Sequence, residues 1–142
     1  MNNKFLLLII FLVSFTALSC DGNEMRILRK DLSSADNIKI YFYDKITGKL
    51  PGSGSVVSIN DPEEVKHFLT TITDEDFNKR QDCTYNGSIE FFSGDKSRIN
   101  MEFNMESNCG FVIFQIRDVM QSKKLSDEGI KLLNFYYGKI AN

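Results

Sequence analysis

A regular alternation of apolar residues between positions 88 and 105 constrains the fold more than any other feature of this sequence. Ile89 and Phe91 occupy every second position, and the same spacing returns at positions 99 to 105. Side chains of a β-strand point alternately to the two faces, so both stretches are predicted to be strands with one apolar face. A slip of one residue would turn that face outward, so we expect Phe91 opposite Ile99 and Ile89 opposite Met101.

This register requires a connection with an odd number of residues between the two strands. We therefore expect the loop to be Gly94-Asp95-Lys96 and not the two-residue Gly94-Asp95 turn that the sequence first suggests. A third strand is predicted from Phe111 to Val119. Its apolar residues fall on both faces, which indicates a central strand or one whose second face is covered.

The remaining segments predict further strands and two amphipathic helices. Asn37–Tyr43 alternates like a strand, and Val56–Ile59 is a short candidate strand. Capping residues and apolar stripes predict helices from Asp61 to Ile72 and from Ser126 to Tyr137, the second ending at Gly138. Residues 73–82 are expected to be a surface loop, and residues 120–125 a turn or short edge strand.

These elements predict an α+β fold, with an antiparallel sheet of four to five strands and two helices packed mainly on its aliphatic face. Residues 37–142 are expected to form a single domain. Met25, Leu28 and Leu32 occur at helical spacing before this domain, so residues 20–36 are expected to be a tether that includes either a short helix or a flexible linker.

The sheet face opposite the aliphatic set is predicted to carry aromatic and charged side chains. Tyrosine, phenylalanine and arginine are enriched in protein–protein interfaces, so this face is a candidate binding surface. The alternative is that a loop or the Met25–Leu32 helix covers it. The candidate residues are Tyr41, Tyr43, Phe92, Phe111 and Arg98.

The N-terminus has the organisation of an export signal. Lys4 provides a positive charge, and an apolar stretch of 14 residues runs from Phe5 to Leu18. A membrane-spanning helix needs about 20 residues, so a permanent transmembrane segment is the weaker interpretation. The sequence Ala17-Leu18-Ser19-Cys20 resembles the lipobox of bacterial lipoproteins, although leucine is more usual at the position of Ala17 and glycine or alanine at that of Ser19.

The lipobox resemblance implies a location. It implies that residues 1–19 are a signal peptide, that Cys20 receives a diacylglycerol, and that acyl chains such as palmitate hold the protein to a membrane of the cell envelope, on the periplasmic face or the cell surface. The alternative is an ordinary secretory signal in which Cys20 is an incidental thiol. Asp21 directly follows the cysteine and leaves the choice of membrane open.

Cysteine usage agrees with export. If Cys20 carries lipid, Cys83 and Cys109 remain as a pair, and they are expected at the same end of the predicted meander because the middle strand runs back between them. We therefore expect a Cys83–Cys109 disulfide. A metal site is not expected, because the cysteines lack paired spacing and His67 is the only histidine.

Composition and residue placement narrow the function classes. Lys4 is the only charged residue before Cys20, which leaves 16 basic against 19 acidic residues, or −3, and argues against nucleic acid as a partner. His67 is expected to point away from the core, and Glu90 and Glu102 to be ordinary surface carboxylates, so neither an enzyme nor a cofactor is expected. The sequence predicts a lipid-anchored module that binds a protein, resembling an inhibitor or immunity factor in role. The alternatives are a structural lipoprotein of envelope assembly and a small hydrolase.

Overall fold

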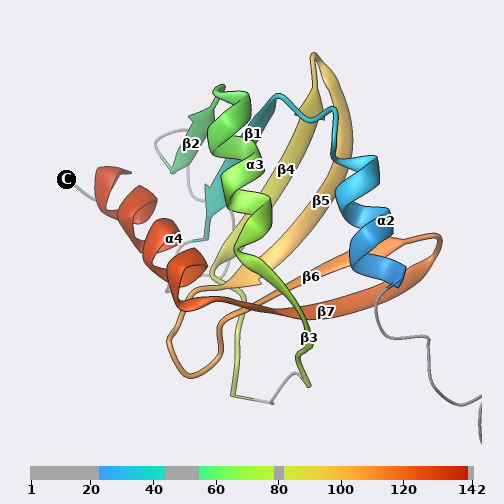
Figure 1. Ribbon diagram of the computed structural model, residues 1–142. Coiled ribbons are helices and arrows are strands. Elements are labelled where there is room, and N and C mark those ends of the chain that lie inside the picture. The colour runs from blue at the N-terminus through green and yellow to red at the C-terminus, as the bar shows by residue number, and fades with distance from the viewer. Residues whose placement is uncertain (1–22, 44–54, 79–81, 141–142) are drawn as a thin grey trace, which may run out of the picture.

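The computed structural model describes residues 23–43, 55–78 and 82–140, which form a curved antiparallel sheet with helices on one face (Figure 1). The helices of this part of the chain are α2 (Asn23–Asp31), α3 (Pro62–Thr70) and α4 (Asp127–Ile140). The strands are β1 (Asn37–Phe42), β2 (Val56–Ile59), β3 (Ile72–Asp76), β4 (Gly87–Ser93), β5 (Lys96–Asn104), β6 (Phe111–Ile116) and β7 (Val119–Leu125).

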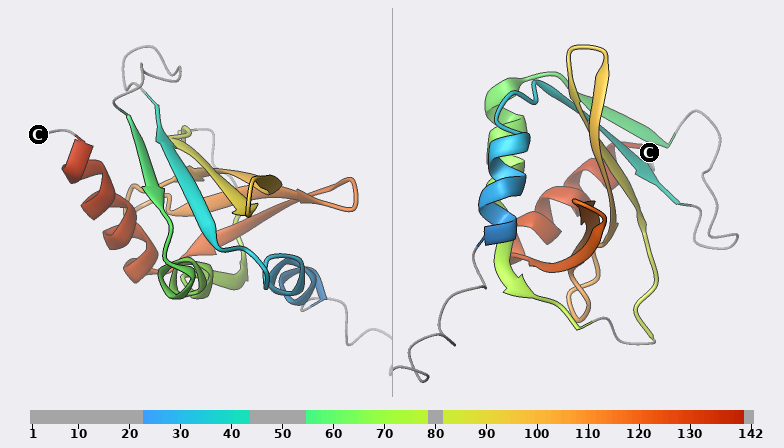
Figure 2. Two further views of the ribbon diagram at one scale, coloured as in Figure 1. Left: turned by 90° about the horizontal axis from the view of Figure 1, so that it is seen from above. Right: turned by 90° about the vertical axis from the view of Figure 1, so that its right-hand side faces the viewer.

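The expected α+β class and antiparallel sheet are confirmed, but the expected strand and helix numbers are too low. The sheet has seven strands in the order β2-β1-β4-β5-β6-β7-β3, and three helices are described. All three pack on the same side of the sheet (Figure 2). β6 lies between β5 and β7, as its two apolar faces predict.

The strand that the sequence did not indicate is β3, which lies where a surface loop was expected. It pairs with β7, bringing Ile72 opposite Leu125 and Asp76 opposite Lys123. β3 is largely acidic and exposed, and the buried Lys123 ammonium bonds to the Asp76 carboxylate. β3 has no apolar face of its own. It is stabilised by an ion pair with β7, a strand that is far from it in the sequence and next to it in the sheet.

The predicted register of the β4–β5 hairpin is confirmed, whereas the predicted loop is wrong. Phe91 lies opposite Ile99, and Ile89 lies opposite Met101. The connection is nevertheless the two-residue turn Gly94-Asp95, because Ser93 pairs with Lys96. A bulge at Arg98, which has no partner in β4, absorbs the extra residue.

The two predicted helices begin at their expected caps and end elsewhere. The Asp61 carboxylate accepts the Glu63 amide hydrogen at 3.0 Å, but α3 ends at Thr70 because Ile72 starts β3. Gly138 does not end the last helix, since α4 continues to Ile140. No Cβ contact or positive φ makes glycine necessary at that position.

The core lies between the helices and the inner face of the sheet. Met25, Leu28 and Leu32 are buried within it, so the segment before β1 belongs to the folded domain, which therefore starts before residue 37. The aliphatic faces of β1, β4 and β5 provide the other side of the core, as the alternation predicts.

Candidate protein-binding face

The outer face of β1, β4 and β5 carries most of the residues that the sequence singled out. The register aligns Lys39, Glu90 and Asn100 in one row across the three strands, and Tyr41, Ser88 and Glu102 in the next. Both rows point away from the helices, because Ile38 and Ile40 of the same strand are buried in the core. We call the outer-face residues of these three strands the aromatic face.

Tyr41 and Glu90 are linked diagonally across this face. Partial burial is the main reason why the pKa of Tyr41 lies above its ordinary value, and the negative charge of Glu90 together with a side-chain hydrogen bond to it raises the pKa further. The two side chains therefore lie close together on the outer face of the sheet, where Tyr41 is half-buried.

Phe92 and Lys39 form a second linked pair. The Lys39 ammonium lies 5.0 Å from the centroid of the Phe92 ring, within the range of a cation–π interaction. Both strands supply a residue to this contact, so it reinforces the pairing of β1 with β4. The ring of Phe92 stays partly accessible and is the apolar centre of this end of the face.

Of the candidate residues, Tyr43 and Arg98 have side chains with the fewest contacts inside the domain. Tyr43 is half-buried and Arg98 is exposed at the β5 bulge. Within the described residues, the guanidinium of Arg98 has no hydrogen-bond or ionic partner. These two side chains are accordingly the ones most available to a second molecule.

Phe111 is a correction to the predicted binding surface. It lies on the outer face of β6, but its side chain has 0% exposure. Phe77 stacks on its ring at 4.8 Å between centroids, and Tyr85 packs against it edge-on at 5.9 Å. Phe77 and Tyr85 thus cover this part of the sheet, so the aromatic face does not extend to β6.

The predicted disulfide is present and belongs to the same cover. Cys83 and Cys109 are bonded, with their Cα atoms 5.8 Å apart, and both pack with Phe111. The buried Asn104 side chain donates to the Thr84 carbonyl at 2.6 Å, which ties the covering chain to β5. The α2 helix, the other predicted cover, packs on the opposite face of the sheet.

The residues that a small hydrolase would need are not brought together. His67 is exposed on α3, and its Nε2 atom lies 3.3 Å from the Glu128 carboxylate on α4. Glu90 and Glu102 lie on the aromatic face, on the other side of the sheet. A histidine-based site would therefore have to use Glu128 and not either of these strand carboxylates.

Two further features bear on the class of site. Among residues 23–43, 55–78 and 82–140, no three or more histidine, cysteine, aspartate or glutamate side chains are placed to hold a metal ion. None of the helices in these ranges has the length and apolar character needed to cross a bilayer.

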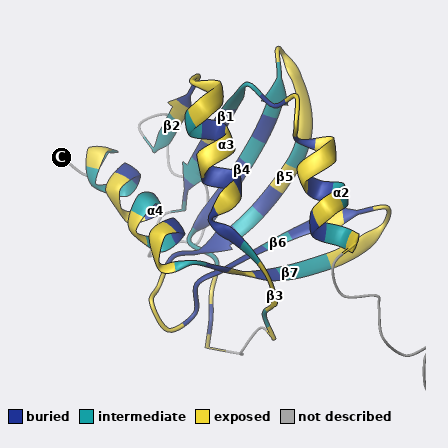
Figure 3. Cartoon of the chain, in the orientation of Figure 1, coloured by how far each residue is buried: buried dark blue, intermediate teal, exposed yellow. Residues whose placement is uncertain are grey.

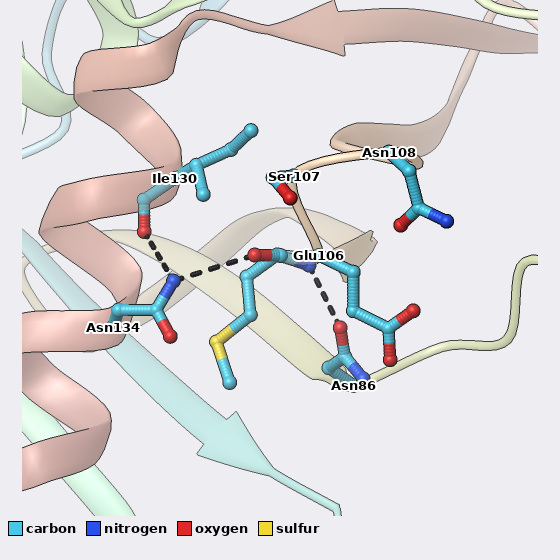
Figure 4. A pocket seen from close by; sticks show the side chains of 7 residues that line it. Asn86, Glu106, Ser107, Asn108, Ile130 and Asn134 are labelled. Atoms are coloured by element: carbon cyan, nitrogen blue, oxygen red, sulfur yellow. Dashed lines mark hydrogen bonds between the residues drawn. The ribbon is translucent and has the colours of Figure 1, made fainter.

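An open pocket of about 450 Å³ lies between the start of α4 and the chain that follows β5 (Figure 4). Asn86 accepts the Met105 amide hydrogen at 2.7 Å, and Asn134 donates to the carbonyls of Ile130 and Met105. Both asparagines thus serve mainly to join strands, loop and helix. The sequence offered no signal for this pocket, because its two asparagines are far apart along the chain.

Comparison of the chain with models of protein families, with curated proteins and with solved structures found no match. The aromatic face and the pocket therefore have to be interpreted from their own chemistry.

Proposed function

We propose that this protein is a lipid-anchored, non-catalytic module of the cell envelope that binds another protein through its aromatic face. The anchoring part rests on the lipobox-like sequence that ends at Cys20. The binding part rests on the outer face of β1, β4 and β5. Its role would resemble that of an inhibitor or immunity factor, which acts by occupying a partner's surface.

The observation that carries the proposal is that this face combines partly accessible aromatic rings with an arginine that has no partner among the described residues. The helices occupy the other side of the sheet, and the cover held by the disulfide lies over β6 and the end of β5, at Phe111, Ile113 and Asn104. Tyr43 and Phe92 offer partly accessible rings, and Arg98 offers a guanidinium that is not neutralised within the described chain. Interfaces concentrate their binding energy in such residues.

The unpaired guanidinium also indicates the partner's chemistry. Arginine forms bidentate hydrogen bonds with carboxylates, and its flat group stacks on aromatic rings. Among the described residues, Glu90 and Arg98 form no ion pair, so the guanidinium keeps its full charge for a partner. We expect a partner surface that presents an acidic group toward Arg98 and apolar surface toward Tyr43 and Phe92.

A photo-crosslinking amino acid placed at Tyr43 tests the binding proposal in the protein's own cells. The matched control carries the same group at Phe135, whose side chain is 57% exposed on α4. We expect a discrete cross-linked partner from position 43 only, and we expect Arg98→Ser to weaken its capture. Equal capture of the same proteins from both positions would show that the aromatic face is not the binding surface.

Loss of binding must be separated from loss of folding. The Tyr43 side chain lies at the end of β1, so Tyr43→Ser is expected to lower the free energy of unfolding by about 1 kcal/mol or less. Intact mass spectrometry of the native protein tests the anchor independently. A chain that starts at Cys20 and carries acyl chains supports it, whereas an unmodified cysteine contradicts it.

A further inference from the structure

The hairpin that joins β6 to β7 ends in an exposed apolar pair. Arg117 and Asp118 form a two-residue turn between the paired residues Ile116 and Val119. Val119 is 56% exposed and the next residue, Met120, is 62% exposed. Figure 3 shows that the tip of the β6–β7 hairpin is exposed. Large apolar side chains at a protruding tip suit an apolar partner.

This tip projects from the same side of the domain as the start of α2. Figures 1 and 2 show the hairpin and the first turn of α2 together at that side, while α4 lies at the opposite side. The buried residues of α2 and the contact of Arg29 with Asp74 at 3.0 Å fix this helix to the sheet. The hairpin and the entry to the domain therefore keep a constant relation to each other.

The length of chain before α2 limits how far the domain can stand from its anchor. Cys20 precedes Asn23, the first residue of α2, by three positions. A fully extended chain spans at most about 3.6 Å per residue, so the anchored cysteine lies within about 11 Å of the helix start. A bilayer that holds Cys20 is consequently close to this side of the domain.

We propose that the β6–β7 hairpin tip is a second membrane contact, in which Val119 and Met120 enter the interface of the bilayer that holds Cys20. The inference rests on the proposed lipidation of that cysteine. Its ligand is a lipid surface, and its role is to orient the domain, with α4 directed away from the membrane.

The charge at the tip defines the kind of lipid surface. Arg117 and Asp118 have opposite charges, and the mature chain has 16 basic against 19 acidic residues, so no net positive charge attracts it to anionic lipid. The contact depends on removing Val119 and Met120 from water. It should form on neutral phosphatidylcholine and change little with salt concentration.

Two side chains are too few to bind a membrane from solution, and the anchor removes that obstacle. Tethering converts the contact into an intramolecular event with a high effective concentration. The domain without its anchor should accordingly remain free in the presence of vesicles, while the anchored domain makes the contact.

Tryptophan fluorescence can test this contact without background, because the chain contains no tryptophan. The variant Met120→Trp reports on the hairpin, and Phe135→Trp is the matched control on α4. Residues 20–142 of each are coupled through the Cys20 thiol to a maleimide lipid in phosphatidylcholine vesicles. Cys83 and Cys109 are bonded to each other, so Cys20 is the reactive thiol.

We expect the emission of Met120→Trp to shift to shorter wavelength on coupling and to be quenched by brominated acyl chains, while that of Phe135→Trp remains solvent-like. Met120→Trp with a capped Cys20 should not respond to added vesicles. Solvent-like emission from position 120 after coupling, or equal quenching at both positions, would overturn the proposal. Chemical coupling makes this result independent of native lipidation, which the mass of the cellular protein tests by itself.

Discussion

The Tyr136 hydroxyl on α4 donates a hydrogen bond to the carboxylate of Glu64 on α3. These residues are far apart in the sequence, and the bond joins two helices that share the same face of the sheet. Tyr136 is otherwise buried, and its ring lies among the core residues. The pair is therefore a polar contact that joins α3 to α4 at the edge of the apolar core.

Removing the hydroxyl should destabilise the domain without changing its packing. Tyr136→Phe keeps the ring and loses a bond to a charged acceptor, so we expect the free energy of unfolding to fall by about 1 to 2 kcal/mol in urea denaturation. Glu64→Gln in the same background should add little further loss. An additive loss in the double variant would show that the two residues do not interact.

The same bond predicts a loss of stability at alkaline pH. Burial, the hydrogen bond and the charge of Glu64 raise the pKa of Tyr136 well above 10.0. The folded state thus keeps this proton where the unfolded state loses it, so the stabilisation is complete below about pH 10 and declines as the pH rises above that value. Urea denaturation from about pH 9 to about pH 11 should show a steeper decline for the native protein than for Tyr136→Phe. Equal slopes would contradict the role of Tyr136.

The disulfide should contribute strongly to stability. Cys83 and Cys109 are separated by 26 positions, and closing a loop of this length restricts the unfolded chain by roughly 3 to 4 kcal/mol. We expect the double variant Cys83→Ser/Cys109→Ser to lose about that amount in urea denaturation. Protease cleavage next to Phe77 and Tyr85 should increase as well, because their cover of Phe111 is loosened. Unchanged cleavage there would show that Phe77 and Tyr85 hold the cover without the bond.

Substitutions in the β6–β7 turn should stabilise the domain. Arg117 and Asp118 both adopt positive φ, at 49° and 65°, a conformation that Asn-Gly adopts readily in a two-residue hairpin turn. Arg117→Asn/Asp118→Gly is therefore expected to raise the free energy of unfolding by about 1 kcal/mol. Thermal unfolding is the measurement, and a lower midpoint would show that other contacts of these side chains outweigh the backbone strain.

Two glycines should respond in opposite ways to the same substitution. A Cβ atom on Gly87 would lie 2.2 Å from the Tyr41 carbonyl oxygen and 2.6 Å from the Phe103 ring, so Gly87→Ala should cost about 2 kcal/mol or more. Gly138 lies inside α4 with open space at its Cβ position, so Gly138→Ala should add about 0.5 to 1 kcal/mol. Urea denaturation of both variants measures the contrast. A loss at Gly138 would contradict the helical assignment there.

Local patterns were sufficient for the register of the central hairpin and for the starts of α3 and α4. The pairing of Ile89 with Met101 follows from one requirement, that the apolar side chains of neighbouring strands share a face. The N-terminal caps follow from the chemistry of an unpaired amide next to a carboxylate or hydroxyl, as at Asp61 and Ser126. The disulfide follows from cysteine number and strand direction.

The candidate face was predictable only in part. Strand alternation fixes the direction in which a side chain points, but whether other residues cover that side chain depends on distant parts of the chain. Alternation places Tyr41 and Phe92 on the outer face correctly. It places Phe111 there too, yet Phe77, which comes from a distant part of the chain, buries it. Exposure depends on neighbours that strand periodicity does not specify.

Spacing along one segment or two neighbouring segments was enough to predict the side-chain directions of β1, β4, β5 and β6, the register of the central hairpin and the starts of α3 and α4. The number of cysteines and the direction of the strands were enough to predict the disulfide. Contacts in the folded domain were needed to show that the acidic segment at Asp76 is a strand, that Arg98 forms a bulge and that Phe111 is covered. Each of those outcomes depends on a contact between segments whose distance in space no local pattern encodes, such as the ion pair that Lys123 makes with Asp76.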